Sequence, residues 1–398
     1  MFLRFALAVA IGLVVDSAAH AQVELVGVVR VPGTATDLSG LPGEVGQGTP
    51  HNLFAAISAL EHLGNGRYLA VADRGPLDGA SQFQCRFHEI ELSFVPGQKP
   101  DREFRVLSTS LLTTPAGQPL VGALEAFDAQ SPERTLRLDP EGLRVGPNGT
   151  VFISDEYGPG LFEFDRTGRR LRTLPTPQAF RVGQPAADPK MEDRLNRTGR
   201  AANAGWEGLA ITPSGQRLVV ATQKSLLQDR VEQGGKRVPG RNTRLVEFDL
   251  ETGATRQLVY QLDEPEHVIS EILAVSETGF VVIERDSRPG SEARVKGIQR
   301  FSLEGATDVT KHLSLAGDQF PAGVVPVQKS PLLDLLDPRF GFAGPDSPEK
   351  WESLAWGPEL ADGRRQLIVV VDNDYVLTAP TIFAAFAIDP AALPARGQ

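Results

Sequence analysis

The sequence predicts an all-β fold, a β-propeller whose four-stranded antiparallel blades surround a central axis. Three observations lead to this prediction. A strand–turn–strand pattern recurs along the chain, a second hairpin follows most of its copies, and the strand missing from the last copy is present near the N-terminus. The 40 glycines and 30 prolines among 398 residues are typical of many short strands joined by tight turns.

The first 21 residues have the features of a signal peptide. Arg4 supplies a positive charge, residues 5–15 form an apolar run, and Ala19 and Ala21 provide the small side chains recognised at a cleavage site. We therefore predict cleavage after Ala21, a single mature propeller domain over residues 22–398, and a periplasmic or secreted location. An uncleaved anchor is the alternative, but the apolar run is much shorter than the roughly 20 residues that span a bilayer. No later stretch is long enough to span one either.

Each copy of the repeat consists of a short apolar strand, a turn containing glycine, a second strand rich in β-branched residues, and a final polar cluster. Four copies begin with a glutamate, and the weaker first copy carries Ser58 near that position. The copies span residues 57–74, 141–156, 207–224, 271–286 and 352–374. Second hairpins are predicted within residues 87–107, 161–174, 245–262 and 299–309, so that one unit comprises four strands.

The last unit has only three predicted strands, of which residues 381–388 form the third. We predict that residues 23–31 supply the fourth strand, because a blade built from both ends of the chain closes the ring and removes two open sheet edges. Five units can be counted. A sixth would have to lie within residues 310–350 or 107–135, so five and six blades both remain open. Residues 330–338 are expected to form one short amphipathic helix.

The repeat glutamates are the first candidate site. The innermost strand of each blade lines the axis, so one repeat position becomes a ring of side chains. Carboxylates that converge in this way repel one another unless a cation lies between them, and carboxylate oxygens are the ligands that Ca²⁺ prefers. The candidate metal ligands are Glu141, Glu207, Glu271 and Glu352. The alternative is that these glutamates form repeated structural hydrogen bonds to the neighbouring blade.

The polar clusters that end the second strands are the second candidate site. Asp73, Arg74 and Glu156 are the candidate catalytic residues, and Lys224 and Arg285 are the candidate substrate-binding residues. Arginine suits this role because its guanidinium group matches the geometry of phosphate and carboxylate. Solvated salt bridges at the rim of the blades are the alternative interpretation of these clusters.

Composition and missing motifs exclude several classes of function. With 40 basic and 50 acidic residues, the net charge of −10 argues against a nucleic-acid partner. Cys85 is the only cysteine, which excludes an intrachain disulfide and any site built from several cysteines. The sequence contains no Gly-x-Ser-x-Gly elbow, His-Glu-x-x-His motif or P-loop.

Four blocks of the sequence resemble the phytase-like family, whose members are usually called "esterase-like activity of phytase" proteins. The blocks begin at Asp73, Glu141, Gly205 and Trp351, and the resemblance covers about residues 23–390. It implies an exported bacterial β-propeller that hydrolyses phosphate esters or other esters, and the related propeller phytases use calcium. The Ser58 of the first repeat departs from the pattern of repeat glutamates.

Two functions from different classes follow from the sequence. The first is a metal-dependent hydrolase, with Ca²⁺ as the expected cofactor and a small ester or phosphoester as the expected substrate. The acidic channel favours it. The second is a non-catalytic periplasmic propeller that binds a ligand or protein partner, which the lack of a recognisable nucleophile–base pair favours.

Overall fold

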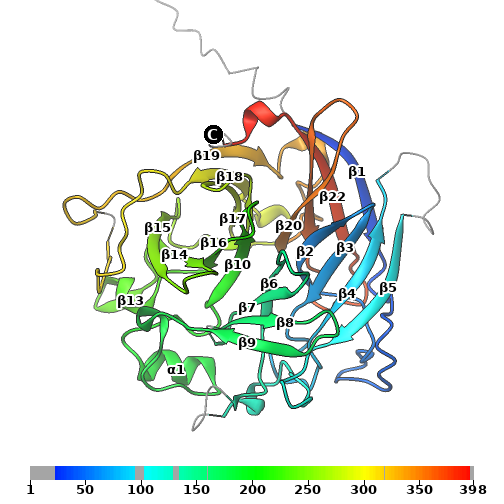
Figure 1. Cartoon of the computed structure of the whole chain (residues 1–398), viewed down its shortest axis with the longest axis horizontal. Coiled ribbons are helices and arrows are strands. Elements are labelled where there is room, and N and C mark those ends of the chain that lie inside the picture. The colour runs from blue at the N-terminus through cyan, green and yellow to red at the C-terminus, as the bar shows by residue number, and fades with distance from the viewer. Residues whose placement is uncertain (1–22, 95–102, 129–133, 159, 318, 395–398) are drawn as a thin grey trace, which may run out of the picture.

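The computed structural model describes residues 23–94, 103–128, 134–158, 160–317 and 319–394, and these form a five-bladed β-propeller (Figure 1). The predicted signal peptide and its cleavage site after Ala21 lie outside the described residues. Each blade is a four-stranded antiparallel sheet whose strands follow one another from the axis outwards. The fold class is therefore confirmed, and the choice between five and six blades is decided in favour of five.

The first three blades are formed by consecutive parts of the chain. Blade 1 contains β2 (Ile57–Gly64), β3 (Arg67–Ala72), β4 (Arg86–Leu92) and β5 (Phe104–Leu111). Blade 2 contains β6 (Pro140–Val145), β7 (Val151–Asp155), β8 (Gly160–Phe164) and β9 (Arg170–Leu174). Blade 3 contains β10 (Trp206–Ile211), β11 (Arg217–Thr222), β14 (Asn242–Asp249) and β15 (Thr255–Gln261).

The last two blades complete the ring. Blade 4 contains β16 (Val268–Ala274), β17 (Gly279–Arg285), β18 (Lys296–Ser302) and β19 (Gln328–Asp334). Blade 5 contains β20 (Trp351–Glu359), β21 (Arg365–Val371), β22 (Thr381–Ile388) and, as its outermost strand, β1 (Val23–Val31). The innermost strands β2, β6, β10, β16 and β20 contact one another in this order around the axis.

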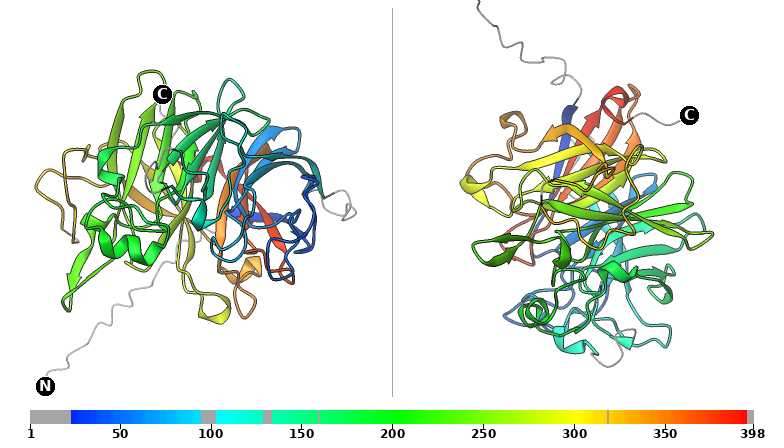
Figure 2. Two further views of the ribbon diagram at one scale, coloured as in Figure 1. Left: turned by 90° about the horizontal axis from the view of Figure 1, so that it is seen from below. Right: turned by 90° about the vertical axis from the view of Figure 1, so that its left-hand side faces the viewer.

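Elements outside the blades lie at the periphery of the ring. The short helix α1 (Pro189–Leu195) and the hairpin of β12 (Val231–Gln233) and β13 (Lys236–Val238) belong to connections within and around blade 3 (Figures 1 and 2). In the part of the chain that the structure describes, no helix has the length and apolar composition needed to cross a membrane.

A separate hydrophobic cluster fills each of the five interfaces between neighbouring blades. Between blades 2 and 3, for example, Phe152 packs with Trp206 and Val220, and between blades 4 and 5 Ile283 packs with Val369 and Phe386. Their side chains are nearly all excluded from solvent. Because the apolar groups of a blade are buried only against its neighbours, the stability of each blade depends on a complete ring.

The predicted closure of the ring is confirmed. Strand β1 pairs with β22 in antiparallel register, from Val23 opposite Ile388 to Val31 opposite Thr381, with one bulge between Leu25 and Gly27. These are the same two segments that the sequence analysis paired. The N-terminal strand thus covers the edge that β22 would otherwise expose.

Two local predictions in blade 4 are wrong. Residues 330–338 do not form a helix: Gln328–Asp334 is strand β19, which pairs with β18 from Ser302 opposite Gln328 to Gly297 opposite Asp334. Pro331 is tolerated there because β19 is the outermost strand, where a missing N–H group costs no ladder hydrogen bond. Leu333 is the buried residue of this edge strand, and the others are exposed or partly exposed.

The fourth strand of blade 4 was expected to lead towards Val309, but this segment has another partner. The backbone N–H of Val309 donates to the carbonyl of Gln257, and that of Val327 donates to the carbonyl of Val259. Both acceptors belong to β15, so the connection covers the outer edge of blade 3. Val309 is fully buried against Val259 as a result.

We predict that the terminal strand is required for folding. A chain that begins at Pro32 should unfold at a lower temperature or aggregate, because it exposes the edge of β22 and uncovers apolar side chains of blade 5. The control is a chain that begins at Gln22, which retains β1. Equal melting temperatures for the two chains in a thermal unfolding experiment would show that strand β1 does not close the ring.

Candidate functional site

A β-bulge interrupts the innermost strand of every blade at the same place. The pairing with the second strand shifts between Ile57 and Ala59, Pro140 and Leu143, Trp206 and Leu209, Ile269 and Ile272, and Trp351 and Ser353. A bulge leaves a residue unpaired and changes the direction of its side chain, which is common beside functional sites. The first residues of these bulges, which we call the inner ring, are Ser58, Glu141, Glu207, Ser270 and Glu352.

A second ring of side chains comes from the end of the second strand in each blade. Its members are Asp73, Glu156, Gln223, Arg285 and Asp372. The backbone fixes their positions. In four blades the N–H group of this residue donates to the carbonyl of the residue just before the inner strand, for example from Asp73 to Ala56 and from Glu156 to Asp139.

The two rings enclose a polar cavity of about 150 Å³ at one end of the axis. Seven carboxylates and three cationic side chains line it. The carboxylates are those of Asp73, Glu141, Glu156, Glu207, Glu349, Glu352 and Asp372, and the cations are Arg74, Arg285 and Lys350. This acidic cavity contains most of the candidate residues that the sequence indicated.

Glu271 does not lie in the acidic cavity, which corrects the prediction that all four repeat glutamates converge. The alignment of the repeats was shifted by one residue in blade 4. Ser270, not Glu271, is the first residue of the bulge, and its hydroxyl accepts a hydrogen bond from Arg285 Nε at 2.8 Å. In extended chain, a shift of one residue turns a side chain to the other face.

Lys224 does not line the acidic cavity either. It follows Gln223, the second-ring residue of blade 3, in the bend that comes after β11. Lys350 is the cation found there, and its Nζ lies 3.6 Å from Asp372 and 2.8 Å from Asp374. Sequence reasoning missed Lys350 and Asp139. Both precede an inner strand at the same repeat position, and that shared position was the signal for them.

Arg74 links several carboxylates on one side of the acidic cavity. Its Nη1 lies 2.8 Å from Asp139 Oδ2 and 3.6 Å from Glu156 Oε2. Burial would raise the pKa of Asp73, but the positive charges of Arg74 and Lys350 hold this pKa below its ordinary value. Burial raises the pKa of Asp139 well above its usual range, although Arg74 opposes this shift.

Arg285 holds the opposite side. Its Nη2 lies 2.6 Å from Glu352 Oε1, which ties the second ring of blade 4 to the inner ring of blade 5. Both side chains are buried, so this ion pair is screened little by solvent. Glu352 is therefore compensated by an arginine, although its Oε2 has no hydrogen-bond partner among the described residues.

Three further glutamates, Glu141, Glu156 and Glu207, converge on one point, and among the described residues only Glu156 forms an ion pair with an arginine, Arg74 at 3.6 Å. One carboxylate oxygen of each lies within 4.8 Å of the others, and all three residues are buried. Glu156 Oε1 and Glu207 Oε2 form no hydrogen bond in the described part of the chain. Burial is the main reason why the pKa of Glu156 is raised to about 7 and why those of Glu141 and Glu207 are raised well above their ordinary values. This arrangement of oxygens fits a hard divalent cation.

Arg144 closes the channel beyond the acidic cavity. Its guanidinium group donates to the carbonyls of Leu60, Ile272 and Leu354, which belong to the inner strands of blades 1, 4 and 5. Its Nη2 also lies 3.0 Å from Glu271 Oε2, and Glu271 Oε1 accepts from the backbone of Leu209 and Ile272. Glu271 thus pairs with an arginine that joins the inner strands, although burial raises the pKa of Glu271 to about 8.

Three comparisons place the chain among known proteins. A family model described as "Phytase-like: Esterase-like activity of phytase" matches residues 52–375. A protein of Arthroderma benhamiae named "Uncharacterized secreted protein" is 27% identical over 451 positions, which cover 88% of this chain and 86% of the relative.

Solved structures give weaker likenesses. The PQQ-bound aldose sugar dehydrogenase of Streptomyces coelicolor is 10% identical, with a TM-score of 0.35 over 90% of this chain and 100% of the other. Virginiamycin B lyase of Staphylococcus aureus is 7% identical, with a TM-score of 0.35 over 84% of this chain and 96% of the other. Similarities at this level carry no conclusion about activity.

We predict that Arg144 is a major source of stability. Arg144→Met should lower the free energy of unfolding by about 3–5 kcal/mol, because it leaves Glu271 buried without its counterion. Adding Glu271→Gln to this variant should restore part of the loss, since a neutral amide needs no counterion. The measurement is chemical denaturation of the wild type, both single variants and the double variant. Strictly additive effects of the two substitutions would contradict the pairing.

Proposed function

Since the chain belongs to the phytase-like family, described as "esterase-like activity of phytase", we propose that it is a secreted, metal-dependent hydrolase of phosphate or carboxylic esters that acts in the acidic cavity. The observation that carries this proposal is the convergence of three buried carboxylates beside Arg74. The secreted relative supports export, for which we retain cleavage after Ala21.

Glu141, Glu156 and Glu207 are the proposed ligands of the cation, and Ca²⁺ is the first candidate because all donors are carboxylate oxygens. A bound divalent cation polarises an ester and lowers the pKa of an attacking water. Glu352 lies in the same cavity, but Arg285 already compensates one of its oxygens. Glu156, assigned to catalysis from the sequence, is reassigned here to the cation.

Asp73 is the proposed general base. It is buried and lies within the acidic cavity, and the positive charges of Arg74 and Lys350 hold its pKa below the ordinary value, which favours the ionised form. Arg74 is placed to stabilise negative charge that develops on the substrate, a role in which fixed cations are effective because they need no reorganisation. Arg285 and Lys350 provide further positive charge in the acidic cavity.

The charge of the acidic cavity restricts the substrate. Carboxylates outnumber cations, so a phosphate ester is repelled unless a divalent cation neutralises the site. A neutral carboxylic ester experiences less of this repulsion. The volume of about 150 Å³ holds the reacting group and leaves the rest of a larger substrate outside.

A non-catalytic propeller that binds a ligand or protein partner is the second candidate function. The ion pairs of Arg74, Arg285 and Lys350 favour it, because they already neutralise part of the acidic cavity without any ligand. In that case the role of these side chains is to hold the blades together. Metal binding without hydrolysis of any ester would favour this alternative.

Calcium should stabilise the wild type and the Glu271→Gln variant but not the Glu207→Gln variant. A ligand that binds only the folded state raises the melting temperature by mass action. Glu271→Gln is a matched control, because Glu271 is also a buried glutamate beside an inner-strand bulge but lies outside the acidic cavity. The measurement is thermal unfolding with calcium and with chelator. A calcium shift retained by Glu207→Gln, or lost in Glu271→Gln, would overturn the ligand assignment.

Hydrolysis should depend on Arg74. Arg74→Met should reduce kcat/KM by about 100- to 1000-fold, as expected for the loss of one group that stabilises the transition state. The assay uses p-nitrophenyl phosphate and p-nitrophenyl acetate with and without chelator, and Arg364→Met at the surface is the control. If neither chelator nor Arg74→Met changes the turnover, the acidic cavity is not the active site.

A further inference from the structure

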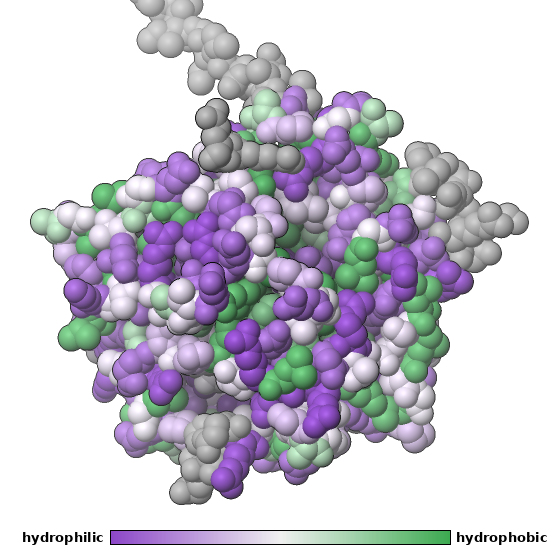
Figure 3. Space-filling model, in the orientation of Figure 1, coloured by the Kyte–Doolittle hydropathy of each residue, from purple (hydrophilic) through white to green (hydrophobic). Residues whose placement is uncertain are grey.

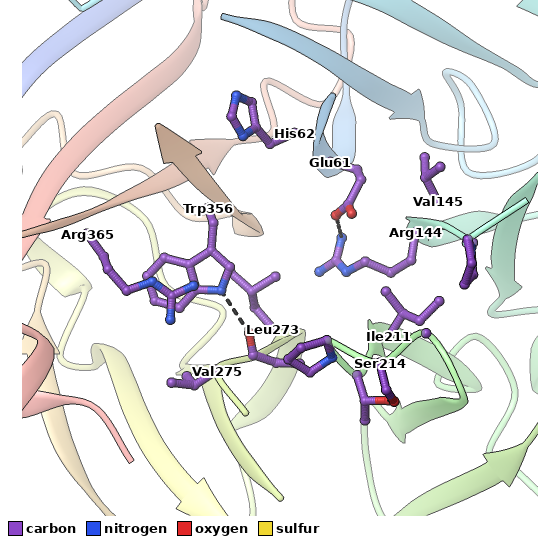
Figure 4. A pocket seen from close by; sticks show the side chains of 16 residues that line it. Glu61, His62, Arg144, Val145, Ile211, Ser214, Leu273, Val275, Trp356 and Arg365 are labelled. Carbon is purple, nitrogen blue, oxygen red and sulfur yellow. Dashed lines mark hydrogen bonds and ion pairs between the residues drawn. The ribbon is translucent and has the colours of Figure 1, made fainter. Parts of the chain in front are cut away.

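The opposite end of the axis contains a second cavity, of about 490 Å³, which no part of the proposed function uses. Every blade contributes to it through the far end of its inner strand. Glu61 comes from β2, Arg144 from β6, Ile211 from β10, Leu273 from β16 and Trp356 from β20 (Figure 4). We call it the far cavity. The inner ring lies at the start of these strands and the far cavity at their ends.

Arg144 closes the inner end of the far cavity. The hydrogen bonds of its guanidinium group to the carbonyls of Leu60, Ile272 and Leu354 block the channel. Arg144 is only 1% exposed, and its Nε has no hydrogen-bond partner in the described part of the chain. In Figure 4 its side chain points from β6 into the cavity, towards Glu61. A buried donor without a partner is costly, and a bound acceptor would satisfy it.

A second guanidinium group lies on the wall of the far cavity. The guanidinium carbon of Arg365 lies 3.6 Å from the centroid of the Trp356 ring, and the indole N–H donates to the carbonyl of Ala274 at 2.8 Å. These contacts fix the indole ring from two sides (Figure 4). The remaining wall is largely apolar, with Ile211 and Leu273 among its side chains. Figure 3 shows apolar side chains gathered near the centre of one face of the ring.

Positive charge prevails in the far cavity. Arg144 and Arg365 line it, and Glu61 is the only carboxylate among its lining residues, although Glu271, outside the lining, pairs with Arg144. His62 also lines it, but burial lowers the pKa of its imidazole and so disfavours the charged form. Glu61 Oε2 lies 3.8 Å from Arg144 Nη1, which is too far for a hydrogen bond. Burial also raises the pKa of Glu61 to about 7, so that this carboxyl carries only part of a negative charge near neutral pH. The far cavity thus contrasts with the acidic one at the other end.

We propose that the far cavity binds a small organic anion, namely a carboxylate attached to an aromatic or aliphatic body. Arg144 and Arg365 receive the carboxylate, while Trp356 and the aliphatic wall contact the body. The volume and the lining of the far cavity fit such a ligand, because ligand pockets of some 300–1000 Å³ typically combine an apolar lining with a few polar groups that orient the ligand. An inorganic phosphate would leave the apolar wall without a partner. The proposal is independent of hydrolysis in the acidic cavity.

The test compares 2-naphthoate with its neutral analogue 2-naphthamide by isothermal titration calorimetry on the full mature chain. We expect naphthoate to bind with one-to-one stoichiometry and the amide to bind at least about tenfold more weakly, since the charge-assisted hydrogen bonds are lost. Trp356 fluorescence should change on binding, whereas Trp206 and Trp351 are fully buried elsewhere. Trp356→Phe should therefore abolish the fluorescence change.

Variants locate the binding site. Arg365→Met should weaken naphthoate binding about tenfold, and Glu61→Gln should strengthen it because a competing carboxylate is removed from Arg144. The matched control Arg364→Met removes a neighbouring arginine that pairs with Asp362 and Glu24 outside the cavity, and it should retain wild-type affinity. Glu207→Gln, in the acidic cavity, should also have no effect.

Three results would overturn the proposal. These are the absence of one-to-one binding of naphthoate, equal affinity for naphthoate and naphthamide, and wild-type affinity in Arg365→Met. Loss of binding in Glu207→Gln would assign the anion to the acidic cavity and would likewise refute the site proposed here.

Discussion

Closure of the ring by β1 and β22 is the constraint on which the rest of the structure depends. Each blade buries its apolar faces only against its two neighbours, so five interfaces exist only when the first and last blades meet. The pairing of Val23–Val31 with Thr381–Ile388 brings the two ends of the chain into one sheet and covers its edge. The inner strands are then held around one axis, and equivalent positions in sequence become neighbours in space.

A second level of organisation arises from the bulges. A regular inner strand would alternate its side chains between the two faces of the blade, with no residue directed by a bulge to the axial cavity. The bulge in each strand turns one residue to the cavity, and the glutamates among these residues meet the second-ring residues there. Such a concentration of buried carboxylates is costly, and Arg74, Arg285 and Lys350 offset part of that cost. The carboxylates whose charge is least compensated by cations are those of Glu141, Glu156 and Glu207. For this reason they are the proposed ligands of a cation.

Arg144 divides the axis into two chemically different ends. The acidic cavity has an excess of carboxylates, which suits a cation and an ester. The far cavity has two guanidinium groups, an indole ring and aliphatic side chains, which suit an organic anion. The overall charge of −10 conceals this difference, because it averages over the whole chain. Since Arg144 bonds to inner strands of three other blades, the same side chain stabilises the ring and separates the two cavities.

The sequence by itself determined the propeller, its repeat unit and the strand that closes it, because period-two patterns, turns and a missing strand are local features of the chain. It also identified Glu141, Glu207, Asp73 and Arg74 through their repeat positions. The number of blades, the strand at Gln328–Asp334 and the placement of Glu271 were decided only by tertiary structure. A bulge displaces a side chain by one position without any mark in the repeat pattern, so that Ser270 faces Arg285 while Glu271 faces Arg144. Which carboxylates remain uncompensated depends on arginines from distant blades, and the sequence alone does not show where those arginines meet them.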